Sequence, residues 1–288
     1  MADPLTAVSI VAELTTNHFG DLGRLDTMIR ASHAAGADYV KLQKRDVDSF
    51  YSSAELDAPY ESPFGSTVGD YRRRLELDVA GFEYVEKLCG SLGIGWFASV
   101  LDRPSFEFMQ QFSPTIIKLP STISGHTEFL RHVARTFAGT VVISTGMTDA
   151  AYEDFVLSTF VRAERIYLLQ CTSAYPAPPE DCNVAVVRHY HEISRIDPRL
   201  FPGYSSHDDG WLGSALAIGA GARMVEKHVK VGHSPWAHFD GVAMDLSNGE
   251  FADYVAHLRG AEMLLGSPVK ALVPSENHKY PYREVIAR

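Results

Sequence analysis

Residues 201–228 read FPGYSSHDDGWLGSALAIGAGARMVEKH and indicate the fold class. A short run at 201–205 is followed by a helical-period stretch at 211–219 and by a second short run at 223–228. Such a unit is typical of a parallel sheet, because parallel neighbours need a crossover connection. The same alternation runs along the chain and predicts eight strands, at residues 8–13, 39–43, 94–99, 115–119, 140–144, 165–171, 201–205 and 223–228.

Helical segments are predicted at 22–35, 71–92, 103–112, 127–136, 149–162, 184–196, 211–219 and 247–265. Eight such units predict an α/β fold, a single (β/α)8 TIM barrel, as one domain over 1–288 with a C-terminal extension at 265–288. A doubly wound open sheet is the alternative, but it should show a glycine-rich turn after the first strand, and residues 13–20 (ELTTNHFG) are not such a turn. Two long connections, 44–69 and 230–246, are expected to overhang the catalytic face.

Composition limits the partners of the chain. A net charge of −10 over 288 residues argues against nucleic acid and anionic membranes as partners. The one basic run, Arg72-Arg73-Arg74, is interpreted as a solvated helix face. Three unpatterned cysteines favour a reducing, cytoplasmic setting, and no signal sequence or membrane span is expected.

Polar residues stand at the ends of nearly all predicted strands, where a barrel brings them together. His207 and His228 follow successive strands and predict a divalent-metal site, although two unrelated histidines would show the same spacing. Lys41 and Lys118 end two other strands, and a buried ammonium is costly unless it meets an anion. An anionic substrate beside a metal is therefore expected. Glu226 could instead form an ordinary ion pair with its neighbour Lys227.

Six segments in order resemble the N-acetylneuraminate (sialic acid) synthase family: IVAELTTNHFG (10–20), GADYVKLQ (36–43), STGM (144–147), CTSAYPAP (171–178), YSSH (204–207) and EKH (226–228). The resemblance implies a TIM-barrel transferase of carbohydrate biosynthesis that uses Mn²⁺ or Mg²⁺. Such an enzyme condenses phosphoenolpyruvate with an open-chain aldose, releases phosphate and forms a 3-deoxy-2-ulosonic acid. A homodimer is also expected.

Matched position by position, the resemblance implies a role for each strand-end residue. His207 and His228 would bind the metal, and Glu13 would handle protons beside phosphoenolpyruvate. The side chains that would hold phosphoenolpyruvate are Lys41, Lys118, Ser121, Ser144 and Ser205, with Ser99 also in the substrate-binding set. Those that would face the sugar are Gln43, Tyr175 and Asp240.

Departures from the family pattern gather on the expected acceptor side. Ile123 stands where the family usually has Glu, and Ser173 where it often has Asn. The family's C-terminal antifreeze-like domain is also expected to be absent, so either the chain uses a different, non-acetylated acceptor or the sequence is part of a longer protein. The chain could alternatively be a 3-deoxy-octulosonate or heptulosonate type synthase, which would need a second phosphate site that no sequence feature marks. A Schiff-base aldolase using Lys41 or Lys118, and a non-catalytic sugar-phosphate binding homologue, also stay open.

Overall fold

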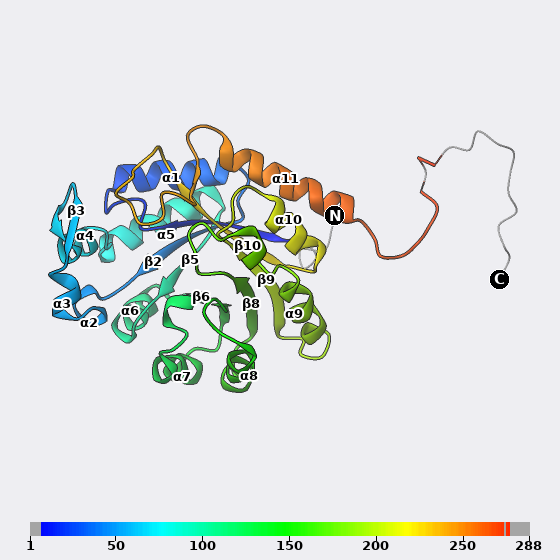
Figure 1. The fold of residues 1–288 in the computed structure, drawn as a ribbon, viewed down its shortest axis with the longest axis horizontal. Helices are drawn as coiled ribbons and strands as arrows, with labels where there is room; N and C mark the ends of the chain where they lie inside the picture. Colours follow the sequence, from blue (N-terminus) through cyan, green and yellow to red (C-terminus); the bar gives the residue numbers. More distant parts are fainter. Residues whose placement is uncertain (1–6, 274, 277–288) are drawn as a thin grey trace, which may run out of the picture.

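The computed structural model describes residues 7–273, 275 and 276, and its centre is a closed barrel of eight parallel strands (Figure 1). Neighbouring strands follow chain order, and β1 closes the ring by pairing with β10. The TIM-barrel prediction is confirmed. The barrel strands are β1 (Ser9–Thr15), β2 (Tyr39–Lys44), β5 (Gly95–Val100), β6 (Ile116–Leu119), β7 (Thr140–Ser144), β8 (Arg165–Cys171), β9 (Leu200–Ser206) and β10 (Met224–Lys230).

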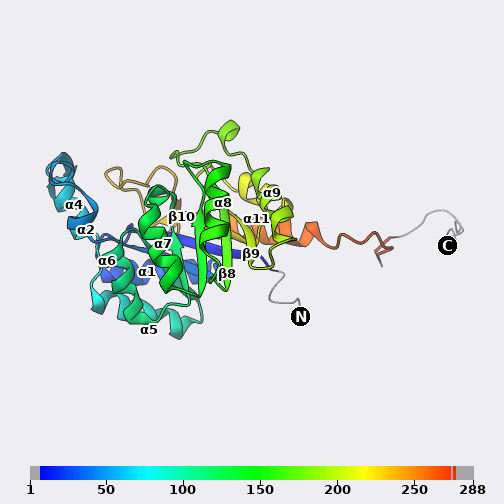
Figure 2. The ribbon, with the colours of Figure 1, turned by 90° about the horizontal axis from the view of Figure 1, so that it is seen from below.

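Helices surround the barrel on the outside, as Figures 1 and 2 show. They are α1 (Leu22–Ala34), α5 (Val79–Leu92), α6 (Arg103–Met109), α7 (Thr127–Thr136), α8 (Ala150–Thr159), α9 (Val186–Ser194), α10 (Leu212–Gly219) and α11 (Glu250–Leu265). The helix predicted over 71–92 is two helices, because Asp78 caps α5 by accepting a hydrogen bond from the backbone N–H of Gly81. Of the C-terminal extension predicted at 265–288, residues 274 and 277–288 lie outside the described residues.

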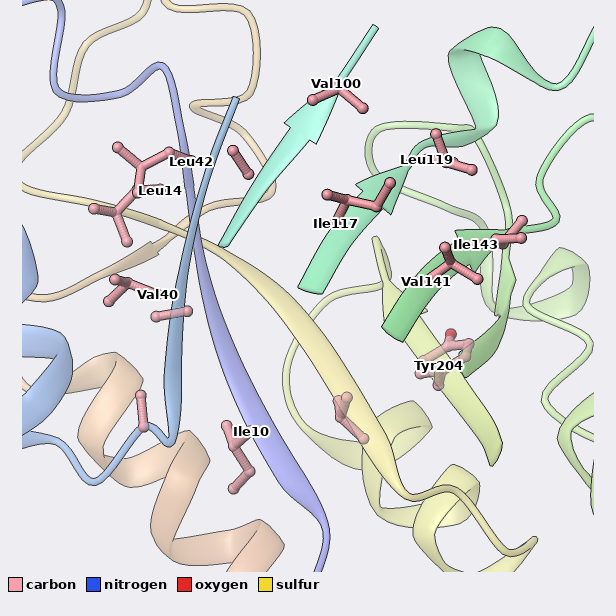
Figure 3. Close-up of a cluster of buried hydrophobic side chains, with 14 of the residues drawn as sticks. Ile10, Leu14, Val40, Leu42, Val100, Ile117, Leu119, Val141, Ile143 and Tyr204 are labelled. Atoms are coloured by element: carbon pink, nitrogen blue, oxygen red, sulfur yellow. The ribbon is translucent and has the colours of Figure 1, made fainter. Parts of the chain in front are cut away.

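Strand side chains alternate between two cores. Outward residues such as Ile10, Leu14, Val40 and Leu42 fill the layer between barrel and helices (Figure 3). Inward residues form a smaller core inside the barrel: Val11, Phe97, Val142, Leu169 and Met224. Because side chains on one face of a strand repeat every two residues, the next inward positions stand one layer higher in the barrel. Those positions are polar: Glu13, Ser99, Ser144, Cys171 and Glu226.

The connection predicted at 44–69 has structure of its own and continues into a further helix. Figures 1 and 2 place it at one end of the molecule, where it contains α2 (Val47–Phe50), α3 (Ser53–Leu56), the hairpin of β3 (Pro59–Ser62) and β4 (Gly65–Thr67), and α4 (Val68–Arg74). The second long connection, after β10, holds the two-residue strand β11 (Met244–Asp245).

The two long connections pack against each other. Trp236, after β10, contacts Phe19 and Phe64 with ring centroids 4.4 and 5.4 Å away. The hydroxyl of Tyr60 donates a hydrogen bond to the carbonyl oxygen of Trp236 at 2.5 Å. We call this set the rim core: Phe19, Tyr60, Phe64, Tyr71, Leu75, Trp236 and Ala237.

Two expectations about the chain as a whole can be compared with the structure. All three cysteines, Cys89, Cys171 and Cys182, are buried and free of disulfides. Over the described ranges, no helix has the length and apolar character needed to cross a membrane.

Candidate active site

The carboxyl ends of the barrel strands surround one polar cavity. It is lined by Glu13, Thr15, Lys41, Gln43, Ser99, Lys118, Pro120, Ser121, Thr122, Ser144, Cys171, Tyr175, Ser205, His207, Glu226, His228 and Phe239. Every site residue predicted from the sequence is in this set except Asp240. Residues as far apart in the chain as Glu13 and Phe239 thus meet in one place, as the barrel topology requires.

The centre of the cavity is a cluster of four buried charges, which we call the central cluster: Glu13, Lys41, Lys118 and Glu226. One carboxylate oxygen of Glu226 accepts hydrogen bonds from the ammonium groups of Lys41 at 2.7 Å and Lys118 at 2.8 Å. Lys41 also pairs with Glu13 at 2.9 Å. The lysines were predicted to require an anion, and in the structure the protein itself provides carboxylates. The alternative pairing of Glu226 with Lys227 is wrong, because Lys227 is on the opposite face of β10 and contacts Ser206.

Protonation differs among the members of the central cluster. Burial raises the pKa of Glu13, but attraction to His228, which is protonated only at the low pH where Glu13 titrates, and to Lys41 outweighs burial and holds the pKa at about 2. For Lys41, burial lowers the pKa, but the two carboxylates more than compensate and the pKa is raised. Burial lowers the pKa of Lys118, and Glu226 offsets this only in part because Lys41 repels a second charge. Lys41 is therefore the more firmly protonated of the two lysines.

The two histidines lie side by side above the central cluster, with ring centroids 5.4 Å apart. The Nδ1 atom of His207 is 2.7 Å from the carbonyl oxygen of Thr172, and that of His228 is 3.0 Å from the hydroxyl of Thr15. A carbonyl can only accept, so Nδ1 of His207 carries a proton, and Nε2 has a free lone pair in the neutral form of the ring. Burial lowers the pKa of His228 to about 3 although Glu13 opposes this, so its ring is neutral near pH 7.

Burial lowers the pKa of His207, but Cys171 and the carbonyl of Thr172 outweigh burial, so this pKa is raised. In its neutral form, each imidazole oriented through Nδ1 has the chemistry expected of a metal ligand. The Nε2 atom of His228 is 3.6 Å from a carboxylate oxygen of Glu13. Within residues 7–273, 275 and 276, however, no three His, Cys, Asp or Glu side chains form a ready-made ligand group. The residues present thus fit an ion held by two imidazoles that leaves other positions for water or substrate oxygens.

Aromatic residues form the side of the cavity that is next to the histidines. Tyr175 packs on His207 with ring centroids 4.3 Å apart, and Phe239 stacks on His228 at 4.6 Å. Asp240 was predicted to face the sugar, but Phe239 occupies the lining instead. The carboxylate of Asp240 binds its own loop, through Lys230 at 3.0 Å and His233 at 2.6 Å.

On a second wall of the cavity, the backbone at Gly146 lies close to the side chains of Ser121 and Ser173. The N–H of Gly146 donates to the hydroxyl of Ser121 at 2.9 Å. A Cβ atom at position 146 would lie 2.7 Å from that hydroxyl and 2.3 Å from the hydroxyl of Ser173, so the segment STGM has room only for glycine here. Lys118 donates to Ser144 at 2.5 Å, which links this wall to the central cluster.

Some features of the site were not visible in the sequence. Ile123, interpreted as a lost sugar contact, is fully buried in the outer core and does not line the cavity. Ser173 is absent from the lining as well. Thr15 and Phe239 were not predicted at all, although Thr15 lies two residues after Glu13 on β1, and a period of two would have pointed to it.

The sequence was compared with protein families and with known proteins. The model described as the NeuB family matches residues 28–270. N-acetylneuraminate-9-phosphate synthase of Mus musculus is 32% identical over 271 residues, covering 93% of this chain and 74% of that protein. N,N'-diacetyllegionaminic acid synthase of Legionella pneumophila is 31% identical over 288 residues, covering 97% and 78%.

A solved structure agrees in fold. The N-acetylneuraminic acid synthetase of Leptospira borgpetersenii superposes with a TM-score of 0.79, covering 93% of this chain and 88% of that chain. The two are 22% identical in sequence, so this likeness concerns the fold alone.

Proposed function

This chain belongs to the NeuB family, and from that premise we propose that it condenses phosphoenolpyruvate with an open-chain aldose. The products are a sialic-acid-like 3-deoxy-2-ulosonic acid and inorganic phosphate. The observation that carries the proposal is the convergence of two histidines, two lysines and four serines from separate strands on one cavity. Hydroxyl and ammonium donors in such a buried site suit a small substrate that bears both a phosphate and a carboxylate.

Phosphoenolpyruvate would bind at the central cluster. Lys41 and Lys118 supply the cationic donors, and the hydroxyl donors come from Ser99, Ser121, Ser144 and Ser205. Because Glu13 and Glu226 already neutralise the lysines, the ammonium groups are held in place before the substrate arrives. Preorganised donors of this kind lose little conformational freedom on binding.

His207 and His228 would hold the divalent ion, Mn²⁺ or Mg²⁺, through their free Nε2 atoms. When bound, such an ion supplies Lewis-acid polarisation of a carbonyl oxygen. Thr15 and the carbonyl of Thr172 keep the two rings oriented toward the cavity. Imidazole is among the ligands that first-row transition metals accept well, which favours Mn²⁺ over Mg²⁺ at a two-histidine site.

The reaction forms one carbon–carbon bond and breaks one carbon–oxygen bond. The electron pair of the enol C2–C3 bond attacks the aldehyde carbon, and the aldehyde oxygen takes up a proton. Water then adds to the electron-poor C2 and gives up a proton, and we assign the carboxylate of Glu13, which lines the cavity beside Lys41 and His228, as its acceptor. Cleavage of the bond between C2 and the phosphate oxygen, with transfer of the C2 hydroxyl proton to the departing phosphate, leaves a ketone and releases phosphate.

The acceptor would enter beside the histidines, where Gln43, Tyr175 and Phe239 line the cavity. A tyrosine face and a phenylalanine ring provide flat apolar walls against which a sugar can lie. Asp240 would contribute indirectly, by holding the loop that carries Phe239.

A phosphate-release assay tests the proposal. The protein is supplied with phosphoenolpyruvate, Mn²⁺ or Mg²⁺, and a panel of aldoses and aldose phosphates, and the 3-deoxy-2-ulosonic acid is identified by mass spectrometry. We expect stoichiometric phosphate and product, with loss of both in EDTA. Release of phosphate without any condensed product, or no turnover with the whole panel, would contradict the proposal.

Two alternative functions can be tested with the same purified protein. A Schiff-base aldolase would be trapped irreversibly by borohydride with pyruvate at Lys41 or Lys118, and we expect no such adduct. A non-catalytic homologue would bind phosphoenolpyruvate without consuming it. The homodimer expected from the family resemblance stays a prediction, for which sedimentation equilibrium is the measurement.

A further inference from the structure

Two arginines lie together over the ring of Tyr51, and we call them the rim arginine pair. Arg45 follows directly after β2, and Arg72 is in α4. The guanidinium groups share the ring of Tyr51, with their central carbons 5.0 and 5.9 Å from its centroid. Arg45 also lies over Phe50 at 4.7 Å, and Arg72 over Tyr71 at 5.2 Å. Aromatic side chains thus fix the positions of both cations.

Neither arginine has an acidic partner among the residues that the structure describes. Arg45 is only 7% exposed, yet within the described part of the chain neither it nor Arg72 forms an ion pair. The Nε atoms of both are buried and have no hydrogen-bond partner. Arg45 donates to the hydroxyl of Tyr51, a neutral group. A buried, unpaired guanidinium is costly, and a second beside it adds repulsion.

The nearest carboxylates are engaged elsewhere. Glu76 accepts hydrogen bonds from Lys44 at 3.0 Å and from the backbone N–H of Arg45 at 3.2 Å. Asp102 caps α6 through the N–H of Ser105 at 2.7 Å and also accepts from the N–H of Asp46 at 2.9 Å. Both acids therefore serve backbone donors or a lysine, and neither is bonded to a rim guanidinium.

The neighbouring arginine on the same helix behaves differently. Arg73 is half exposed and pairs with Asp48 at 2.7 Å. The interpretation of Arg72-Arg73-Arg74 as a solvated helix face thus holds for Arg73 but is wrong for Arg72, which is partly buried and unpaired. This contrast makes Arg73 a matched control.

The pair lies on the acceptor side of the cavity. The backbone N–H of His238 is 3.4 Å from the hydroxyl of Tyr71, which carries Arg72 on its ring. The ring of His238 is in turn 6.4 Å from Tyr175, which packs on His207. Burial lowers the pKa of His238, and repulsion from Arg72 and Arg45 adds to this, so both cations are close to it.

The distance between the rim arginine pair and the central cluster follows from the course of the chain along β2. Lys41 and Gln43 face the cavity from β2, and Arg45 continues the same two-residue period. Four residues of strand advance about 13 Å, which is comparable with an open-chain sugar phosphate bound beyond phosphoenolpyruvate. An anion at the rim arginine pair would therefore belong to the far end of the acceptor.

We propose that Arg45 and Arg72 form an anion subsite for the acceptor, so that this protein uses an aldose carrying a phosphate ester at the end opposite the aldehyde. This inference rests on the proposed condensation and names its acceptor class. Planar guanidinium groups bind phosphate through paired hydrogen bonds, and the two buried Nε–H groups would then find partners. The subsite also provides the second phosphate position for which the sequence offered no sign.

The first test measures turnover. Phosphate release is followed with matched pairs of acceptors, such as mannose and mannose 6-phosphate, N-acetylmannosamine and its 6-phosphate, and arabinose and its 5-phosphate. For the best pair we expect kcat/KM to favour the ester. Arg45→Met and Arg72→Met should each lower the ratio of ester to parent sugar by about 10- to 150-fold, the factor for losing hydrogen bonds to a charged group. Arg73→Met should keep the wild-type ratio.

The second test measures binding without chemistry, so that it does not depend on the condensation. Glucitol 6-phosphate lacks an aldehyde and cannot react, and glucitol lacks the anion. Calorimetry should show binding of glucitol 6-phosphate to the wild type and to Arg73→Met. The same titration should show binding weakened in Arg45→Met and Arg72→Met, while glucitol binds weakly to all four proteins.

The two tests separate the inference from the function on which it rests. If all acceptors fail to turn over but glucitol 6-phosphate binding still depends on both arginines, the subsite stands and the condensation is wrong. If parent sugars are used as well as their esters and the variants bind glucitol 6-phosphate like the wild type, the subsite is wrong and the condensation stands. Far-ultraviolet circular dichroism and urea unfolding confirm that each variant is folded.

Discussion

The central cluster and the rim arginine pair are both buried groups of charge, but they are built on opposite principles. In the central cluster each ammonium has a carboxylate within 2.9 Å, and one oxygen of Glu226 serves two lysines. In the rim pair the cations have aromatic neighbours and unpartnered Nε atoms. Charges that neutralise each other are held in place by the folded state before any ligand binds, whereas uncompensated charges obtain an anion only from a ligand.

The largest expected effect is on stability at the central cluster. Glu226→Gln removes the carboxylate that holds Lys41 and Lys118, and breaking a buried pair from one side costs about 3 to 5 kcal/mol. Urea unfolding followed by circular dichroism measures the loss. The matched control is Glu107→Gln, which breaks an exposed pair with Arg103 and should change the free energy of unfolding by less than about 0.5 kcal/mol. Equal stability of both variants would mean that the central cluster is not part of the folded-state energetics.

The next effect is on turnover at the histidines beside that cluster. His207→Ala and His228→Ala should each lower kcat/KM at least about 100-fold, since even the outer-shell partners of metal ligands are worth 10 to 100-fold. Bound metal, measured by elemental analysis after gel filtration, should fall in the same variants. His189→Ala, which removes an exposed imidazole paired with Glu153, serves as the control. Full activity of either variant in EDTA would end the metal assignment.

A smaller effect is expected on phosphoenolpyruvate binding. Lys118→Ala should weaken the affinity by about 1.5 to 3 kcal/mol, the range for hydrogen bonds to a charged group. Calorimetric titration with phosphoenolpyruvate is the measurement, and Lys87→Ala, an exposed residue of α5, is the control. Unchanged affinity in Lys118→Ala and in Lys41→Ala would place the phosphate elsewhere.

Removing a buried charge from the rim arginine pair should change the stability much less than removing one from the central cluster. Arg45→Met removes a buried charge for which the described residues provide no paired anion, and it forfeits contacts with aromatic rings worth about 0.5 to 2 kcal/mol. Relief of the unpaired charge offsets that loss, so the free energy of unfolding should stay within about 1 kcal/mol of the wild type. A loss as large as that of Glu226→Gln would show that Arg45 has a partner in the folded protein and would remove the contrast between the two regions.

The smallest expected effect is a change in the pKa of His238, which tests how close the rim arginine pair lies to that residue. Loss of either guanidinium should raise the pKa of His238 toward its ordinary value, because each cation now lowers it. Titration of the histidine ring protons by nuclear magnetic resonance measures the change, and Arg73→Met should leave it unaltered. An unshifted His238 in both rim variants would place the arginines too far away to share a ligand with it.

The barrel could be predicted from the sequence because local pattern and global fold agree in every strand. Runs such as 140–144 and 165–171 were predicted with the same bounds that the structure shows. The inward polar positions follow from the same two-residue period, which is why the predicted site residues converge. The region 44–69 was harder to predict, because four-residue helices and a short hairpin leave too few periods for a pattern to emerge.

The sequence did not determine which charged residues pair with each other. Glu226 could have paired with its neighbour Lys227 or with lysines more than a hundred residues away, and only the closed barrel decides this. Asp240 and Phe239 are adjacent, and the loop conformation decides which of them lines the cavity. Arg72 and Arg73 look alike in sequence, yet Arg72 packs on the rings of Tyr51 and Tyr71, whereas Arg73 is half exposed.

The rim core affects which part of the protein can unfold locally. Phe19, Phe64 and Trp236 come from three distant parts of the chain and form a small apolar unit separate from the barrel cores. A unit with its own contacts can unfold locally while the rest of the molecule stays native, and at a lower free energy. Backbone amides of the hairpin and of the segment around Trp236 should therefore exchange with deuterium at one common rate, ahead of the barrel strands. The entrance would then act as a cooperative unit, and the residence time of a bound sugar would follow its opening.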